Sequence, residues 1–325
     1  MALTLLGHGK NETLLAHHIV ADKIFPTWIF KGPFGVGKAS LAYKFAKRLL
    51  SDVAPADDLQ INYDDHVGKL VDLRIHPDFF VLEQDDASID DVRHLLARVR
   101  KTPALSKRRV VILENFSNLN RNIYNSLLKI LEEPPEHAVF ILICTNIGMI
   151  PKTLLSRAAK INFNPIDNSL VKKVLENMKI ENAEDLARLS NGSVGYALYL
   201  CANDGIDIYN GILQNFSDGN YKKALKNIIT NNLCSNFMII KESILRILKI
   251  YADILNNVDD ESCEREKLIL QRNINLDNVC VEKEIKKISE LISLINKTES
   301  MMLDKNAVVM CVFETFFANF AKAAS

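Results

Sequence analysis

The sequence carries no excess of charge of either sign, because its 40 Lys and Arg residues balance its 40 Asp and Glu residues. A neutral chain offers no whole-molecule attraction to nucleic acid, so any contact with DNA must be local or made through partners. The sequence also lacks an amino-terminal signal segment and any apolar run of the ~18 residues needed to span a bilayer. We therefore expect a cytoplasmic protein with no membrane contact.

Cysteine is scarce, and no two cysteines form a Cys-x-x-Cys pair. The six residues are Cys144, Cys201, Cys234, Cys263, Cys280 and Cys311. Their scatter excludes a disulfide framework and indicates reduced thiols that mostly fill the core.

What the sequence does contain is most of a phosphate-binding loop in residues 32–40, Gly-Pro-Phe-Gly-Val-Gly-Lys-Ala-Ser. Such a loop needs two glycines five residues apart, then lysine, then serine or threonine. The glycines and the lysine are present, but Ala39 stands where a hydroxyl would bind Mg²⁺. The candidate nucleotide-binding residues of the loop are Gly32, Gly35, Gly37, Lys38 and Ser40.

The segments around the loop place it between a strand and a helix. Residues 27–30 are apolar and rich in β-formers, and Leu41, Phe45 and Leu49 recur at helical spacing. In this order the backbone N–H groups of the turn and the positive end of the helix meet at one point, where an anion can bind without a hydroxyl. The alternative is a tight strand-to-helix turn with no ligand.

The first half of the chain alternates strand-like and helix-like segments, which is typical of an α/β fold with a largely parallel sheet. We predict strands at 27–31, 78–83, 109–113 and 139–144, and an irregular insertion over 52–72. From about residue 166 only helical spacing remains. The predicted domains are an α/β domain over 1–165, a small helical domain over 166–207 and an all-helical domain over 208–325.

Two apolar stripes mark the last of these domains. The first comprises Ile239, Ile240, Ile244, Ile247, Leu248 and Tyr251, and the second Val308, Val309, Val312, Phe313, Phe316, Phe317 and Phe320. Stripes this strong indicate helices that bury them in a core or a subunit interface.

A site that hydrolyses nucleotides needs a second element, an apolar strand ending in Asp for Mg²⁺ and Glu for the attacking water. The candidate is residues 109–115, Arg-Val-Val-Ile-Leu-Glu-Asn. Glu114 is long enough to reach a metal ion, but Asn115 cannot accept a proton. Together with Ala39, this predicts that turnover is lost, while phosphate binding stays open.

The segments after this strand carry a family resemblance. Residues 120–135, Asn-Arg-Asn-Ile-Tyr-Asn-Ser-Leu-Leu-Lys-Ile-Leu-Glu-Glu-Pro-Pro, resemble the helix and turn that follow the second motif in clamp-loader ATPases. Residues 140–146 resemble the sensor strand of these AAA+ proteins, and 154–158, Leu-Leu-Ser-Arg-Ala, resemble their Ser-Arg-Cys motif. The chain is thus similar to clamp-loader subunits of bacterial DNA polymerase III, densely over residues 5–165 and thinly over 166–200.

The resemblance implies an AAA+ P-loop domain followed by a helical lid and an all-α collar that joins subunits into a ring fragment. In such a ring, a neighbouring subunit inserts an arginine toward the γ-phosphate of each ATP, and Arg157 takes that role here. Ser156 beside it is expected to be a local hydrogen-bonding partner, because no His and acid accompany it. The alternative for Arg157 is a helix cap or a surface ion pair.

The sequence also departs from the family. Many relatives carry a four-cysteine zinc module between the first two strands, but residues 51–80 contain no cysteine, so we expect no zinc. Active relatives place an arginine that contacts ATP in the lid helix after Gly-Ser, and Gly195 occupies that place here. A third part of the hydrolytic site is therefore missing.

These observations predict a clamp-loader subunit of DNA polymerase III that does not itself hydrolyse ATP and supplies Arg157 to a neighbouring ATPase subunit. Its expected partners are the other clamp-loader subunits and, through the assembly, the sliding clamp and primed DNA. Two alternatives remain. One is a self-sufficient ATPase that uses Glu114 and Ser40, and the other is a passive scaffold whose arginine is idle.

Overall fold

The computed structural model describes residues 7–51, 59, 66–83, 88–116, 119, 121–148, 150–217, 233–258, 263–271 and 281–300. The chain divides into two compact units, residues 1–197 and 198–325. The first unit holds the sheet, and the described part of the second is helical. The finer division at residues 165 and 207 stays a prediction.

The first unit is built on a five-stranded sheet in the order β2-β3-β4-β1-β5, in which all neighbours run parallel. Its strands are β1 (Thr27–Lys31), β2 (Phe79–Leu82), β3 (Arg109–Leu113), β4 (Ala138–Cys144) and β5 (Ala159–Asn162). The four predicted strands are confirmed to within a residue or so at each end. The predicted α/β fold with a parallel sheet is confirmed as well.

The extent to which each strand is buried explains why some strands could be predicted from the sequence and β5 could not. Every residue of β3 and β4 is buried, because helices cover both faces of a parallel sheet and its central strands become continuous apolar runs. The edge strand β5 was missed. Its residues alternate between exposed and buried, and Ile161 is its one large apolar side chain, so a four-residue pattern was too weak to detect.

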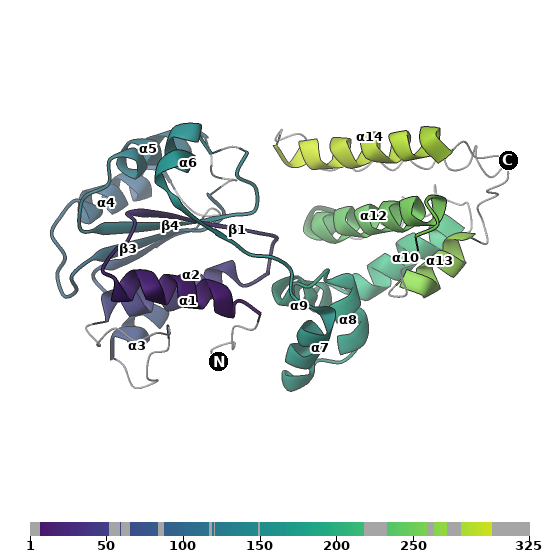
Figure 1. Cartoon of the computed structure of the whole chain (residues 1–325), viewed down its shortest axis with the longest axis horizontal. Coiled ribbons are helices and arrows are strands. Elements are labelled where there is room, and N and C mark those ends of the chain that lie inside the picture. Colours follow the sequence, from purple (N-terminus) through teal and green to yellow (C-terminus); the bar gives the residue numbers. More distant parts are fainter. Residues whose placement is uncertain are drawn as a thin grey trace. The chain divides into compact units, whose positions relative to one another are not determined.

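Helices cover both faces of this sheet (Figure 1). On one face lie α1 (Gly9–Val20), α2 (Lys38–Leu50) and α3 (His66–Asp72), and on the other α4 (Ile89–Val99), α5 (Arg121–Glu132) and α6 (Lys152–Arg157). The prediction of an irregular segment was wrong for residues 66–72, which form α3. Apart from Leu59, residues 52–65 lie outside the described part of the chain.

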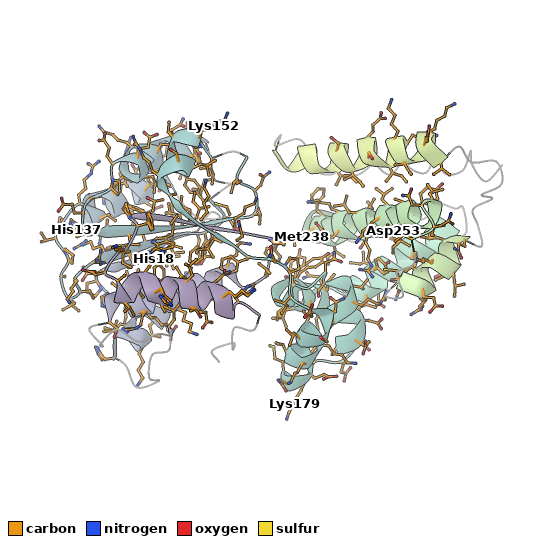
Figure 2. All side chains as sticks on the ribbon, in the orientation of Figure 1. His18, His137, Lys152, Lys179, Met238 and Asp253 are labelled. Carbon is orange, nitrogen blue, oxygen red and sulfur yellow. The ribbon has the colours of Figure 1, made fainter. Side chains whose placement is uncertain are left out.

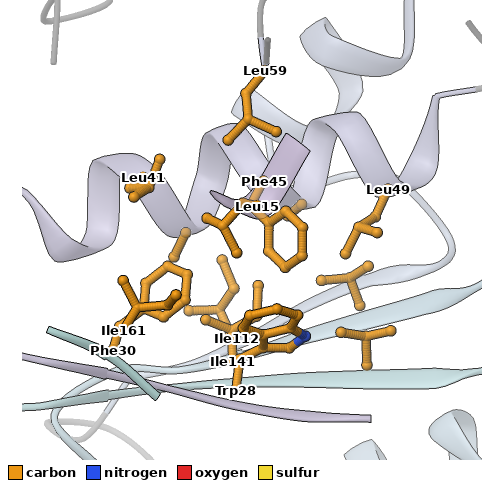
Figure 3. Close-up of a cluster of buried hydrophobic side chains, with 14 of the residues drawn as sticks. Leu15, Trp28, Phe30, Leu41, Phe45, Leu49, Leu59, Ile112, Ile141 and Ile161 are labelled. Atoms are coloured by element: carbon orange, nitrogen blue, oxygen red, sulfur yellow. The ribbon is translucent and has the colours of Figure 1, made fainter. Parts of the chain in front are cut away.

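The core on the α1–α2 face positions the loop that comes after β1. Trp28 of β1 meets Phe45 of α2 edge to face, with ring centroids 5.3 Å apart, and Leu15 of α1 and Leu41 of α2 are fully buried beside them (Figure 3). Apolar burial of this extent fixes α2 against β1, so the loop between them has little freedom.

The rest of the first unit comprises α7 (Asn168–Asn177), α8 (Ala183–Leu189) and the start of α9 (Val194–Ala202). The second unit contains α10 (Gly205–Ser217), α12 (Leu233–Leu255), α13 (Glu264–Gln271) and α14 (Val281–Ser300). The predicted stripe from Ile239 to Tyr251 lies on α12 and is buried, which confirms that part of the helical prediction. The stripe from Val308 to Phe320 lies outside the described residues.

Candidate nucleotide loop and candidate trans-acting arginine

The glycine-rich loop leaves β1 at the carboxyl edge of the sheet and enters α2. Gly35 and Gly37 adopt positive φ angles of 72° and 107°, a conformation that side chains disfavour, and Gly37 is the N-cap of α2. Gly32 is required for a different reason, because a Cβ there would lie 2.4 Å from the backbone oxygen of Phe163. The strand, turn and helix order predicted for this segment is therefore confirmed.

Lys38, the residue expected to meet phosphates, binds the loop itself. Its Nζ donates to the backbone oxygens of Gly32, at 2.7 Å, and Pro33. The side chain is buried, and burial lowers the pKa of the amine to about 8. The lysine thus stabilises the turn and carries a weaker positive charge than an exposed lysine at the same pH.

The hydroxyl of Ser40 does not take the place of the one missing at Ala39. The two residues are neighbours on α2, and consecutive side chains on a helix point about 100° apart. Ser40 is exposed, whereas Ala39 packs against the core. The loop therefore has no hydroxyl at the place where Mg²⁺ needs one.

Glu114, at the end of β3, lies among other charged and polar groups. Burial, and next the carboxylate of Glu83, raise the pKa of its carboxyl. Arg74 forms an ion pair with Glu83, and the pKa of the Tyr43 hydroxyl is raised to about 12 by burial and by Glu114. The Glu114 carboxyl therefore gives up its proton less readily than that of an ordinary glutamate, and Mg²⁺ binds the ionised form. The next residue, Asn115, is exposed and has a positive φ of 49°.

The Ser-Arg pair ends the short helix α6. Ser156 Oγ donates to the backbone oxygen of Thr153 at 3.0 Å, a local hydrogen bond within the helix. Arg157 is exposed, and its Nη1 makes a long 3.5 Å contact with the backbone oxygen of Glu132 at the end of α5. Most of the guanidinium's donors therefore face solvent.

Arg157 and the nucleotide loop lie at opposite ends of the parallel strands. Arg157 lies at their amino ends, here called the amino edge of the sheet, and the loop lies at their carboxyl ends, the carboxyl edge. Arg157 precedes β5, whose first residue Ala159 pairs with Trp28, whereas the loop begins after Lys31. Three residues of strand separate these two levels, roughly 10 Å at ~3.3 Å per residue. Arg157 consequently belongs to the amino edge, as does His137 just before β4, which Figure 2 labels.

A buried carboxylate at the amino edge, that of Asp78, binds a loop distant in the sequence, and the sequence did not reveal this role. Asp78 is fully buried and accepts the backbone N–H groups of Ala104, Leu105 and Ser106 at 2.7–3.0 Å. Arg109 Nε lies 3.5 Å from it. An acid directly before an apolar strand was the only available signal, and it does not reveal partners 26 residues or more along the chain.

Within the described ranges, no group of three or more His, Cys, Asp or Glu side chains gathers as metal ligands would. Among the same residues, no helix has the length and apolar character needed to cross a membrane.

Known proteins resemble this chain over the part that carries the site. A family model described as DNA polymerase III, delta subunit, matches residues 7–167. The tau subunit of DNA polymerase III from Escherichia coli (strain K12) is 32% identical over 211 residues, which make up 60% of this chain and 32% of that protein. The gamma subunit from Buchnera aphidicola subsp. Baizongia pistaciae (strain Bp) is 26% identical over 92% of this chain and 78% of that protein.

A solved structure of a DNA polymerase III gamma subunit-related protein from Thermotoga maritima has a TM-score of 0.42 at 15% identity, covering 97% of this chain and 100% of that one. The chain spans only about a third of the length of the Escherichia coli relative, 32% of it. The family match at 7–167 includes the loop, Glu114 and Arg157.

Proposed function

From the match of residues 7–167 to the family model described as DNA polymerase III, delta subunit, we propose that the chain is a delta-prime-type clamp-loader subunit without ATPase activity of its own. It supplies Arg157 to ATP bound by a neighbouring subunit. In this role it takes part in loading the sliding clamp onto primed DNA and is a component of the polymerase holoenzyme.

The observation that carries this proposal is the separation of Arg157 from the chain's own loop. Arg157 lies at the amino edge of the sheet and the loop at the carboxyl edge, so the guanidinium cannot serve phosphates held by its own chain. It is exposed, and its contact with Glu132 is long, so a partner's phosphate oxygens have access to its planar fork of donors. An arginine supplied in trans can raise the rate of hydrolysis ~10³-fold or more.

The state of the loop supports the absence of turnover by this chain. Ala39 offers Mg²⁺ no hydroxyl, Asn115 cannot act as a base, and Gly195 replaces the lid arginine of active relatives. Glu114, the candidate ligand for the metal ion, has a raised pKa and so gives up its proton less readily than an ordinary glutamate.

The proposed partners follow from the same family match. The chain would join other clamp-loader subunits through its helical second unit and would reach the clamp and the DNA through the assembly. ATP belongs to the neighbouring subunits, and the proposal includes no zinc.

Two experiments test this function. The purified chain should show no Mg²⁺-dependent ATP turnover, and turnover that Lys38→Ala abolishes would favour a self-sufficient ATPase instead. In a reconstituted clamp loader, Arg157→Ala should lower the ATPase rate that clamp and primed DNA stimulate. Unchanged ATPase and clamp-loading rates in Arg157→Ala would instead favour the alternative that the chain is a passive scaffold subunit.

A further inference from the structure

The helix α5 ends in carbonyl groups that the following residues cannot all satisfy. The last carbonyls of a helix lack the N–H donors that the next turn would have supplied. The N–H of Glu133 still donates to the backbone oxygen of Lys129, at 3.1 Å. The next two donors along the chain would be Pro134 and Pro135, and proline has no N–H. The last carbonyls of α5 must therefore bond groups outside the helix.

Arg157 brings a cation to this end of α5. The helices α5 and α6 lie side by side on one face of the sheet (Figure 1). Nη1 of Arg157, at the end of α6, contacts the backbone oxygen of Glu132, the last residue of α5, at 3.5 Å. A guanidinium at this place bonds a carbonyl and offsets the negative end of the helix dipole. In the chain by itself, Arg157 is therefore a cap of the carboxyl end of α5.

The chain after α5 is anchored again within a few residues. The backbone N–H of Ala138 donates to the backbone oxygen of Pro135 at 2.9 Å, and that of Arg109 donates to His137 at 2.7 Å. A ring nitrogen of His137 lies 3.1 Å from the backbone oxygen of Val99. A change in the capping of α5 is therefore confined to its last turn and does not extend into β4.

A phosphate group competes for the same arginine. The contact with Glu132 is long and made to an uncharged oxygen, whereas a phosphate offers charged oxygens that the planar fork of an arginine binds in pairs. Arg157 is exposed, so a phosphate can reach it. Once paired with phosphate, the guanidinium no longer offsets the negative end of α5, and the phosphate brings more negative charge close to it. The last turn of α5 then loses stabilisation.

We propose that Arg157 exchanges two partners, the carboxyl end of α5 in the chain by itself and a neighbour's phosphate in the assembly, so that ATP on the neighbour loosens the last turn of α5. The inference rests on the proposed function and adds to it a response within this chain. The arginine acts on the neighbour's ATP and at the same time transmits the presence of that ATP to its own subunit.

The first measurement follows hydrogen exchange in the full chain without partners. Arg157→Ala should speed exchange over residues 129–133 about two- to fivefold, the size expected when a helix end loses a cation. Arg157→Lys keeps the charge and should stay close to the wild-type rate. Lys152→Ala on the same helix is the control and should change nothing, and residues 138–144 should be unaffected in every variant. An unchanged rate over residues 129–133 in Arg157→Ala would overturn the proposal.

The second measurement compares the reconstituted clamp loader with and without ATPγS and Mg²⁺. The partners are present in both states, so protection by the subunit interface does not by itself produce a difference. With the wild-type chain, ATPγS should speed exchange over residues 129–133 about two- to fivefold. In an assembly that carries Arg157→Ala it should change nothing there. Exchange that ATPγS leaves unchanged or slows in the wild type would contradict the release of α5.

ATP turnover of the same assemblies separates this inference from the proposed function. Loss of turnover in Arg157→Ala together with unchanged exchange overturns the inference alone. Turnover that Arg157→Ala leaves unchanged overturns the proposed function and the exchange of partners with it, even where the arginine caps α5. Arg157→Lys should cap α5 and yet turn over more slowly, because lysine lacks the planar fork of donors.

Discussion

Thr153 Oγ1 donates to Glu132 Oε1 at 2.9 Å, and this contact joins the first turn of α6 to the end of α5. Glu132 also accepts from Arg157 through its backbone oxygen, and Ser156 binds the backbone oxygen of Thr153. Both residues of the Ser-Arg motif are thus connected to this pair. Because an arginine acting in trans must be presented at a defined angle, we treat Thr153 and Glu132 as positioning residues for Arg157.

Replacing Thr153 tests this positioning role. Thr153→Val keeps the shape of the side chain and removes the hydrogen bond, which is exposed and contributes about 1 kcal/mol or less to the free energy of unfolding. The stimulated ATPase rate of the reconstituted assembly should nevertheless fall several-fold, and Thr153→Ser should restore it. A rate that Thr153→Val leaves unchanged would show that α6 holds Arg157 without this contact.

Asp78→Asn should destabilise the first unit by about 3 kcal/mol or more, because it leaves Arg109 buried without its charge partner and places an amide against three N–H donors. Asp90→Asn is the control, since its ion pair with Arg93 is exposed and contributes little. Urea unfolding at neutral pH measures both, and similar losses in the two variants would contradict the role given to Asp78.

The same carboxyl predicts a dependence on acid. Burial acts to raise the pKa of Asp78, but the bonds from Leu105, Ala104 and Ser106 and the charge of Arg109 outweigh it, so the pKa lies below its ordinary value. The unfolded chain then binds more protons in acid, and the stabilisation is lost as pH falls through the folded pKa. Urea midpoints from about pH 5 down to about pH 2 should fall less steeply in Asp78→Asn than in the wild type. Parallel curves would contradict this assignment.

Lys38 predicts that stability also rises with pH, in a separate alkaline range. Its folded pKa of about 8 lies below the value of about 10.4 in the unfolded chain, so the unfolded state binds more protons between the two. Stability should therefore rise with pH in that window relative to a Lys38→Met variant. Thermal unfolding of both chains between about pH 8 and about pH 10 measures the difference, and a constant difference would show that Lys38 is not buried as described.

In the second unit, Arg246 of α12 lies 3.7 Å from Glu266 of α13, and Glu266 is 2% exposed. Tyr209 of α10 also donates to Glu266, at 3.3 Å. Arg246→Met should destabilise this unit by about 3–5 kcal/mol, because a buried carboxylate loses its charge partner. Arg246→Met combined with Glu266→Leu should recover most of that loss. A double variant no more stable than Arg246→Met would show that the pair is not coupled.

Continuous burial made some elements easy to predict from the sequence. Residues 139–144 could be assigned as a strand because every side chain of β4 is covered on both faces. The edge strand β5 and the helix α3 could not, since each is short and only partly apolar. The loop and the Ser-Arg motif were found as motifs, but two relationships were not. The sequence shows that Gly195 stands where active relatives have an arginine, but it does not show that Gly195 contacts Gly35. It also does not show that the partners of Asp78 come from a distant loop.

The most direct test of the central claim compares two cations of α6 in the reconstituted clamp loader. Lys152, labelled in Figure 2, is exposed on the same short helix as Arg157 and is its matched control. We expect Arg157→Ala to lower the ATP turnover stimulated by clamp and primed DNA about 100-fold or more, and Lys152→Ala to change it less than about twofold. Equal turnover in the two variants would contradict the claim that this chain acts through Arg157.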